Sequence, residues 1–475
     1  MMSVRTGALI TIALTAVISG CAGTSPSIYG APQSLVQTNT AVKPARRRAH
    51  SPIKHVVIMI QENRTFNDFF ATFPGADGST TGVMAQSPGC GVPARATVSL
   101  TESNLVTPHD MNHQYPAYKI ARNGGQMDGF DKVRFGGGGT LECTVPYQYT
   151  NPNQIQPYWE MARQYVLAEH MFTTQGSGSF TAHQDLIAGA TTVAPSKAMV
   201  DLPTCSGLKC VWGCDAPKSP PTRTSLITQS DQYLRDQGPF PCSNKFKVPY
   251  PTLRDLLDAK SISWKYYVPP MSANFGKLMS AFDVVAAVRY GPEWTTNVVT
   301  PQTQIFNDIS SHSLPAVSWV IPDEPDSDHP GEKVDNGPEW VASVVNAIGG
   351  SRYWKSTAII IVWDDWGGLY DNLVPPVKGY GYGGLGFRVP AIIVSPYARA
   401  GYISPTQYEF GSVLKYIEKN WNLGSLGTSD VRANSLIDSF NYLQTPIHFS
   451  AIPSSLSKSY FIHRKPSYLP VDTDL

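Results

Sequence analysis

The stretch T-A-I-I-I-V-W-D-D-W-G-G-L-Y-D, Thr357 to Asp371, predicts the fold most directly. Its first seven residues are apolar or β-branched, which is typical of a strand buried on both faces of a sheet. Asp364 and Asp365 follow at once, and ligands of open α/β sheets bind beyond the carboxyl ends of the strands. Adjacent carboxylates repel each other unless a cation or a shared proton relieves them. The stretch indicates a metal site; the alternative is a solvated turn with two exposed acids.

A second stretch shows the same pattern of an apolar run followed directly by polar residues. Ile53 to Phe70 reads I-K-H-V-V-I-M-I-Q-E-N-R-T-F-N-D-F-F, and its apolar run ends in Glu62 and Asn63. Two such strands would place Glu62, Asn63, Asp364 and Asp365 in one crevice. All four side chains offer oxygen, which suits one hard divalent cation of unspecified identity.

Strand and helix patterns alternate along the rest of the chain, which predicts an α/β fold with a mostly parallel central sheet flanked by helices. We expect a single domain over residues 52–475. The expected strands are Trp264 to Val268, Leu314 to Ile321 and Val389 to Ser395, and the expected helices are Pro157 to Glu169, His183 to Ala190, Pro251 to Ile262, Asn336 to Ile348 and Tyr408 to Trp421. The formal net charge of +1 argues against a nucleic-acid partner.

Three polar segments add candidate reactive groups. His113 lies in a glycine-bordered loop, and His329 follows the strand pattern that ends at Ile321. Ser179 precedes a short helical pattern, where free backbone N–H groups favour an alkoxide or a phosphate. The alternatives are surface histidines without a role, and a Ser179 or Thr181 that only caps the helix.

The N-terminus has the pattern of an export signal. Arg5 precedes an apolar run that ends in V-I-S-G-C, and the run is too short for an ordinary membrane span. This ending resembles the bacterial lipoprotein box, which makes residues 1–21 a signal peptide and Cys21 the lipidated first mature residue. The alternative is an ordinary signal peptide cleaved nearby. Residues 22–51 read as a flexible linker, so we expect an exported lipoprotein of the cell envelope, attached to the membrane through lipid on Cys21.

The remaining six cysteines favour disulfides over a zinc knot, because export exposes them to oxidising conditions. Four of them lie in a Pro/Gly/Ser-rich insertion at about residues 195–250, with no clear periodicity: Cys205, Cys210, Cys214 and Cys242. The sequence does not determine the pairing; our expectation is that Cys90 bonds to Cys143.

Six segments in the same order resemble the bacterial phosphoesterase family. They are E-N-R-T-F-N-D-F-F, N-G-G-Q-M-D-G-F, S-W-V-I-P…H-P-G, W-D-D-W-G-G-L-Y-D, G-F-R-V-P-A-I-I-V-S-P-Y and Y-E-F-G-S-V-L-K-Y-I-E. This family holds phospholipases C and acid phosphatases within the alkaline phosphatase-like superfamily. The resemblance covers about residues 53–423 and implies an exported, metal-dependent phosphoric-ester hydrolase, acting on a phosphorylated small molecule or a phospholipid. The oligomeric state stays open.

The resemblance also implies roles for individual residues. Ser179 matches the nucleophile that forms a phosphoserine intermediate, although Thr181-Ala182 stands where relatives have Pro-Asn. His113 and His329 match histidines that contact phosphate or protonate the leaving group. The implied metal ligands are Glu62, Asn63, Ser179, Asp364 and Asp365.

Two departures from the family pattern keep other functions open. Asn372 and Pro405 stand where relatives often carry histidines, so a catalytically silent lipoprotein that binds a phosphorylated ligand or an envelope partner is an alternative. A sulfatase-like hydrolase is a third possibility. The chain lacks a Cys or Ser followed by x-Pro-x-Arg near Ser179, which argues against it.

Overall fold

The computed structural model describes residues 51–85, 90–91, 93, 95–108, 110–136, 139–141, 143–204 and 211–468. The predicted signal peptide with Cys21, residues 22–50 of the predicted linker, and Cys205 and Cys210 lie outside these ranges. None of the helices in the described ranges combines the length and the apolar character that a membrane-spanning helix requires.

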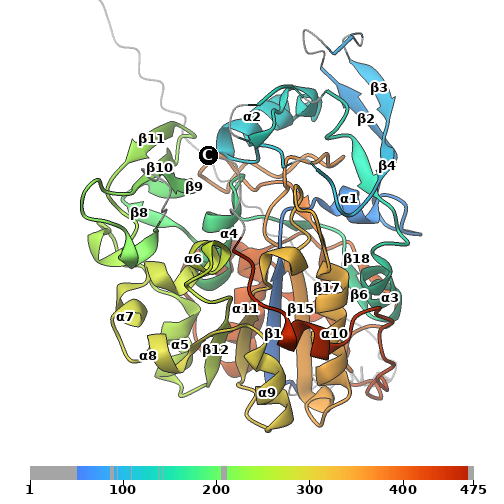
Figure 1. Cartoon of the computed structure of the whole chain (residues 1–475), viewed down its shortest axis with the longest axis vertical. Helices are drawn as coiled ribbons and strands as arrows, with labels where there is room; N and C mark the ends of the chain where they lie inside the picture. The colour runs from blue at the N-terminus through green and yellow to red at the C-terminus, as the bar shows by residue number, and fades with distance from the viewer. Residues whose placement is uncertain are drawn as a thin grey trace, which may run out of the picture. The chain divides into compact units, whose positions relative to one another are not determined.

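The central element is an eight-stranded sheet, which Figure 1 shows with helices in front of it and behind it. Five neighbouring strands run parallel and two further pairings are antiparallel, so the predicted α/β class with a mostly parallel sheet is confirmed. In spatial order the strands are β13 (Val298–Val299), β12 (Trp264–Tyr267), β14 (Val317–Val320), β1 (His55–Gln61), β15 (Thr357–Trp363), β17 (Ala391–Val394), β6 (Val166–Ala168) and β18 (Tyr402–Ser404).

The strands β1 and β15 occupy the middle of the sheet because their side chains are apolar on both faces. Every residue of β15 is buried, and Val56 to Ile60 of β1 have no exposed surface. Burial of such residues contributes roughly 1.5–3 kcal/mol for each large apolar side chain. The apolar runs therefore place the two strands in the core, with their polar ends at one edge.

Helices pack on the sheet in two groups. The helices α3 (Gln156–Gln164), α9 (Gln304–Ser310) and α13 (Lys458–His463) contact α10 (Gly337–Gly349), and α5 (Leu253–Ala259), α6 (Asn274–Met279) and α11 (Phe410–Trp421) contact α4 (Ser179–Ala188). The shorter helices are α1 (Phe66–Phe70), α2 (Tyr115–Arg122), α7 (Ala286–Arg289), α8 (Glu293–Thr296) and α12 (Ser429–Arg432). Small strands complete the described chain: β2 (Thr81–Met84), β3 (Ala96–Ser99), β4 (Thr101–Ser103), β5 (Gln148–Thr150), β7 (Met171–Phe172), β16 (Arg388–Val389) and β19 (Tyr408–Glu409).

One predicted helix is too long. The helical spacing from Pro157 to Glu169 continues only to Gln164, and Val166–Ala168 form strand β6 instead. β6 pairs with both β17 and β18, and its three residues are fully buried. Pairing with distant strands outweighs the local helical pattern there, since strand formation depends on neighbours that the pattern does not contain.

The insertion is more regular than its composition indicates. It forms a four-stranded antiparallel sheet of β8 (Thr192–Ala194), β9 (Lys197–Thr204), β10 (Arg223–Thr228) and β11 (Tyr233–Gln237). A disulfide joins Cys214 to Cys242. A second disulfide joins Cys90 to Cys143, which confirms the expected pair.

Candidate metal and phosphate site

The register of the two central strands brings the predicted oxygen ligands together. β1 and β15 are parallel neighbours, and their last paired residues are Gln61 and Trp363. The next residues, Glu62 and Asp364, therefore leave the sheet side by side. The backbone N–H of Asn63 donates to Asp364 Oδ1 at 2.9 Å, and the N–H of Asp365 donates to the same oxygen at 2.7 Å.

The turn after β15 is closed by a glycine. Gly367 has φ +56°, and a Cβ built on it would lie 2.2 Å from the backbone oxygen of Asn63. Only glycine allows the two loops to approach so closely without strain. Gly367 thus allows the acid-bearing loop to pack against the Glu62-Asn63 loop.

Ser179 reaches this site from the start of α4. Gly178 occupies the N-cap position and no side chain caps the helix, so the alternative of Ser179 as a mere cap is wrong. Ser179 Oγ instead lies 3.0 Å from Asn63 Oδ1 and 3.1 Å from Asp365 Oδ2. A hydroxyl there also faces the positive end of a ten-residue helix, which favours negative charge.

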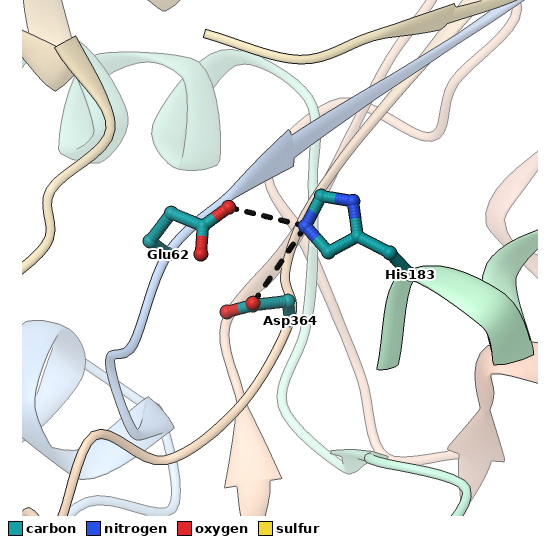
Figure 2. Close-up of side chains that lie close together, drawn as sticks. All are labelled: Glu62, His183 and Asp364. Carbon is teal, nitrogen blue, oxygen red and sulfur yellow. Dashed lines mark hydrogen bonds and ion pairs between the residues drawn. The ribbon is translucent and has the colours of Figure 1, made fainter. Parts of the chain in front are cut away.

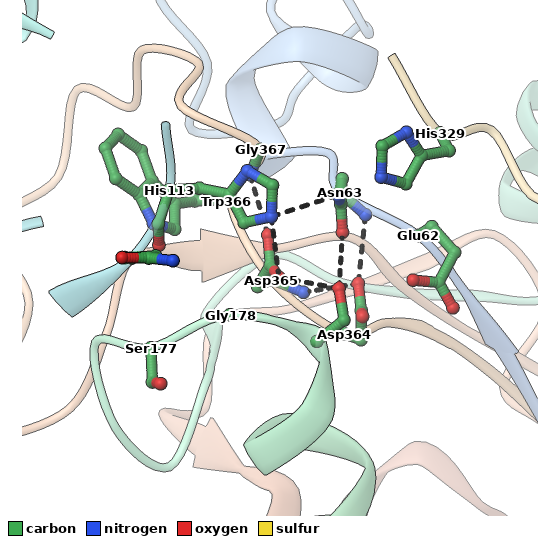
Figure 3. Close-up of polar contacts among 12 residues, drawn as sticks. Glu62, Asn63, His113, Ser177, Gly178, His329, Asp364, Asp365, Trp366 and Gly367 are labelled. Carbon is green, nitrogen blue, oxygen red and sulfur yellow. Dashed lines mark hydrogen bonds and ion pairs between the residues drawn. The ribbon is translucent and has the colours of Figure 1, made fainter. Parts of the chain in front are cut away.

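His113 and His329 lie on either side of Asn63 in the view of Figure 3. Each ring is held through Nδ1 by a backbone carbonyl, at 2.7 Å from Met111 and 2.6 Å from Pro330. Because a carbonyl only accepts, Nδ1 carries the proton in each ring. In the neutral rings Nε2 is therefore an acceptor, and both Nε2 atoms face the Asn63 amide nitrogen, at 3.3 Å from His113 and 2.8 Å from His329.

The orientation of the Asn63 amide follows from these tautomers. If its nitrogen donates to the two neutral histidines, its oxygen faces only other oxygens: Ser179 Oγ at 3.0 Å, Asp364 Oδ1 at 3.1 Å and Asp365 Oδ2 at 3.3 Å. Ligands at about 2.1 Å from a cation and at right angles to one another lie about 3 Å apart. The oxygen cluster therefore fits a hard divalent cation. The opposite amide orientation satisfies the hydrogen bonds without a cation only when both histidines donate from Nε2.

Glu62 belongs to a neighbouring group that includes a residue not predicted from the sequence. Its Oε1 lies 3.1 Å from Nε2 of His183, which in turn lies 3.7 Å from Asp364 Oδ2 (Figure 2). Ligand atoms of these three residues lie within 4.8 Å of one another, and all three are buried. The spacing of Ser179 and His183 by four positions on a helix was the available signal, because such residues share one face.

Burial shifts the ionisation of this group. It raises the pKa of Asp364 to about 8, and the neighbouring Glu62 adds to the rise. It lowers the pKa of His183 to about 4, against the opposing effect of Asp364. A cation would reverse the shift of Asp364, since it favours the ionised carboxylate.

A buried network lies directly behind the site. Asp328 Oδ2 accepts hydrogen bonds from Tyr158 at 2.6 Å and from the Trp363 indole at 2.9 Å, and Arg64 Nε donates to the Asp328 carbonyl at 2.7 Å. Asp328, Trp363 and Arg64 each adjoin a site residue in sequence: His329, Asp364 and Asn63. The network therefore fixes the backbone from which those three side chains project, in the manner of outer-shell partners in metal sites.

The two positions that depart from the family pattern have structural contacts. Asn372 Oδ1 accepts from the buried Arg388 at 2.7 Å, and Arg388 also pairs with Asp371 at 3.0 Å. The carbonyl of Pro405 lies 3.0 Å from Nδ1 of His170. Asn372 thus helps Asp371 to hold the buried Arg388.

The chain is similar to several known proteins. The sequence model of the Phosphoesterase family matches residues 53–424. The chain is similar to phospholipase C A of Mycobacterium tuberculosis, with 24% identity over 83% of this chain and 78% of that protein. It is similar to the non-hemolytic phospholipase C of Pseudomonas aeruginosa, with 23% identity over 86% of this chain and 60% of that protein. Among solved structures, a protein in the alkaline phosphatase superfamily from Vibrio parahaemolyticus matches 83% of this chain and 75% of its own, at 12% identity and a TM-score of 0.36.

Proposed function

The chain belongs to the Phosphoesterase family, and from that premise we propose that it is a metal-dependent phosphoric-ester hydrolase whose nucleophile is Ser179. One observation carries the proposal. Ser179 is the first residue of helix α4, at the carboxyl edge of the sheet. Its hydroxyl lies 3.0 Å from the amide oxygen of Asn63 and 3.1 Å from a carboxylate oxygen of Asp365. This arrangement suits a hydroxyl that loses its proton and attacks a phosphate.

The residues that would hold the metal are those of the oxygen cluster: Asn63, Ser179, Asp364 and Asp365, with Glu62 beside them. When bound, a divalent cation lowers the pKa of a coordinated hydroxyl and neutralises phosphate charge. Its positive charge would also offset the repulsion between the neighbouring carboxylates of Asp364 and Asp365.

The chain's own residues divide the reaction into two displacements. Ser179 Oγ gives its proton to Asp365 Oδ2, which lies 3.1 Å away, and attacks phosphorus; the Oγ–P bond forms and the bond to the leaving alcohol breaks. With substrate bound, His329 or His113 would take up a proton on Nε2 in place of its contact with the Asn63 amide and give that proton to the departing oxygen, while its Nδ1–H stays on the backbone carbonyl. Water then attacks the phosphoserine and gives a proton to the histidine, Ser179 Oγ takes back its proton from Asp365 as the Oγ–P bond breaks, and free phosphate or a phosphomonoester leaves.

The proposed substrate class is a phosphorylated lipid or small molecule. Similarity to proteins named phospholipase C supports a phosphorylated lipid as the substrate. The arrangement of Ser179 and the two histidines recognises only the phosphate group, so it accommodates a monoester or a diester. A catalytically silent protein that binds a phosphorylated ligand is the competing function. Asn372 stands where relatives often carry a histidine, and here its side chain accepts a hydrogen bond from Arg388.

Ester hydrolysis with and without a chelator tests the proposal. We expect the purified protein from about residue 49 onward to release nitrophenol from p-nitrophenyl phosphate or p-nitrophenylphosphorylcholine. Because the oxygen cluster needs a cation, EDTA should abolish release and added divalent metal should restore it. The preferred ester distinguishes a phosphatase from a phospholipase C. Metal-loaded protein that hydrolyses neither ester would favour the silent protein.

We further propose that the chain is exported and carries lipid on Cys21, because V-I-S-G-C precedes a polar linker. Cells that express the full chain should incorporate labelled palmitate into it and retain it in the membrane fraction. The Cys21→Ala variant should lose all label, whereas Cys90→Ala serves as a cysteine control that keeps it. Label that persists in the Cys21 variant would refute the lipid anchor.

A further inference from the structure

We propose that Asp364 bridges two neighbouring cation positions, the second of which is formed by Glu62 and His183. The inference rests on the proposed metal-dependent function and adds a second ion and a new ligand to it. The first position is the oxygen cluster of Asn63, Ser179, Asp364 and Asp365 described above.

The second position has its own ligand atoms. Glu62 Oε1 and His183 Nε2 lie 3.1 Å apart, and His183 Nε2 and Asp364 Oδ2 lie 3.7 Å apart. Figure 2 shows the three side chains, from three separate segments of the chain, directed at one another. Glu62 and Asp364 have no exposed surface and His183 is 1% exposed, so the two carboxyl groups lie out of contact with bulk water. A cation between the three would offset the repulsion between the two carboxylates when both are ionised.

The two oxygens of Asp364 are divided between the two groups. Oδ1 accepts the backbone N–H groups of Asn63 and Asp365 and lies 3.1 Å from the Asn63 amide oxygen. Oδ2 faces His183 at 3.7 Å, and the Asp364 carboxyl also shares a side-chain hydrogen bond with Glu62. A carboxylate with its two oxygens so divided can bridge cations about 3.5–4 Å apart, the spacing of two-metal hydrolytic sites.

The ligand atoms predict different ions at the two positions. The first offers only oxygen, from carboxylates, an amide and a hydroxyl, which suits Mg²⁺, Ca²⁺ or Mn²⁺. The second adds an imidazole nitrogen to two carboxylates, a set that suits Zn²⁺ better than Mg²⁺. The site would accordingly hold a hard cation beside Ser179 and a softer one beside His183.

The competing interpretation gives His183 a purely structural role. In that case its Nε2–H donates to Glu62 and orients the carboxylate toward a single ion, and His183 never touches metal. Both interpretations predict that loss of His183 lowers activity. Activity therefore cannot separate them, but the number of bound ions can.

The number of bound ions tests the proposal. The protein is exposed to Zn²⁺ and Mn²⁺, free ions are removed, and the bound metal is measured by mass spectrometry. We expect about two ions per wild-type chain, and about one in His183→Gln, which keeps a hydrogen-bonding side chain of similar length. His55→Gln is the matched control, because His55 begins the strand that ends just before Glu62 and its ring contacts the Pro315 carbonyl. It should bind two.

A spectroscopic measurement covers the case in which His183→Gln folds poorly. In the wild-type protein loaded with Co²⁺, an imidazole bound through Nε2 should give a strongly shifted, exchangeable Nδ1–H proton resonance. One ion per wild-type chain at saturation, or no such resonance, would overturn the second position. Either result would leave the proposed hydrolase intact, because a single-ion enzyme would still hydrolyse the nitrophenyl esters.

Discussion

Asp364→Ala is expected to abolish turnover and metal retention together. Asp364 supplies Oδ1 to the oxygen cluster and Oδ2 to the Glu62–His183 group, and Oδ1 also accepts two backbone N–H groups that shape the loop. Its loss removes a negative charge from every cation position at once. We expect kcat/KM for the nitrophenyl esters to fall more than about a thousandfold, with bound metal close to zero.

The isosteric variant Asp364→Asn distinguishes the effect of losing the negative charge from the effect of losing the shape of the side chain. Its remaining oxygen can still accept the two N–H groups, so the fold should persist while metal affinity falls. Asp258→Ala, on the exposed side of α5, is the matched control and should retain wild-type turnover and metal content. Wild-type activity in Asp364→Ala, with metal bound, would show that the site is misassigned.

Ser179→Ala is expected to abolish turnover but to spare most of the bound metal. The serine contributes one of several oxygens to the cluster, whereas the carboxylates of Asp364 and Asp365 remain. Loss of a nucleophile in comparable serine hydrolases lowers kcat by up to about a millionfold. Turnover should fall at least about a thousandfold, with metal content near that of the wild type.

Trapping of the phosphoserine intermediate provides a second test of Ser179. Acid quenching of wild-type protein during turnover of a ³²P-labelled ester should leave phosphate on Ser179, and Ser179→Ala should carry none. Ser177→Ala is the control from the same loop, since Ser177 accepts the backbone N–H of Asp201 at 2.7 Å and contacts Thr181 rather than the oxygen cluster. Phosphate attached to Ser179→Ala at another residue would exclude Ser179 as the nucleophile.

The contrast between the two variants is itself informative. Asp364→Ala should lose metal and activity, whereas Ser179→Ala should lose activity alone. If both variants lost metal equally, Ser179 would be a structural ligand of the ion more than a nucleophile. The pair thus tests whether the serine oxygen and the carboxylate oxygens have separate roles in one cluster.

Much of the site follows from local sequence. The strands β1 and β15 were predictable because each is an uninterrupted apolar run, and such runs are buried wherever the sheet forms. Their polar ends had to emerge at one edge once the strands were parallel neighbours. The structure places Asn63, Ser179, Asp364 and Asp365 in contact there, with His113 and His329 beside the Asn63 amide.

Other features depended on the tertiary structure because no local pattern contains them. β6 is a strand only because β17 and β18 flank it, and the insertion is a sheet only because four short segments pair. His183 reads as an ordinary helix residue until β1 and β15 bring Glu62 and Asp364 against it.

The sequence by itself determined the central strands, the acids and amide at their ends, and the family. Only the folded chain shows which of these side chains lie in contact with one another. Hydrophobic burial and strand length are properties of a single segment, so a linear reading recovers them. Coordination depends on distances of about 3 Å between atoms from distant segments, and those exist only once the sheet has fixed the register.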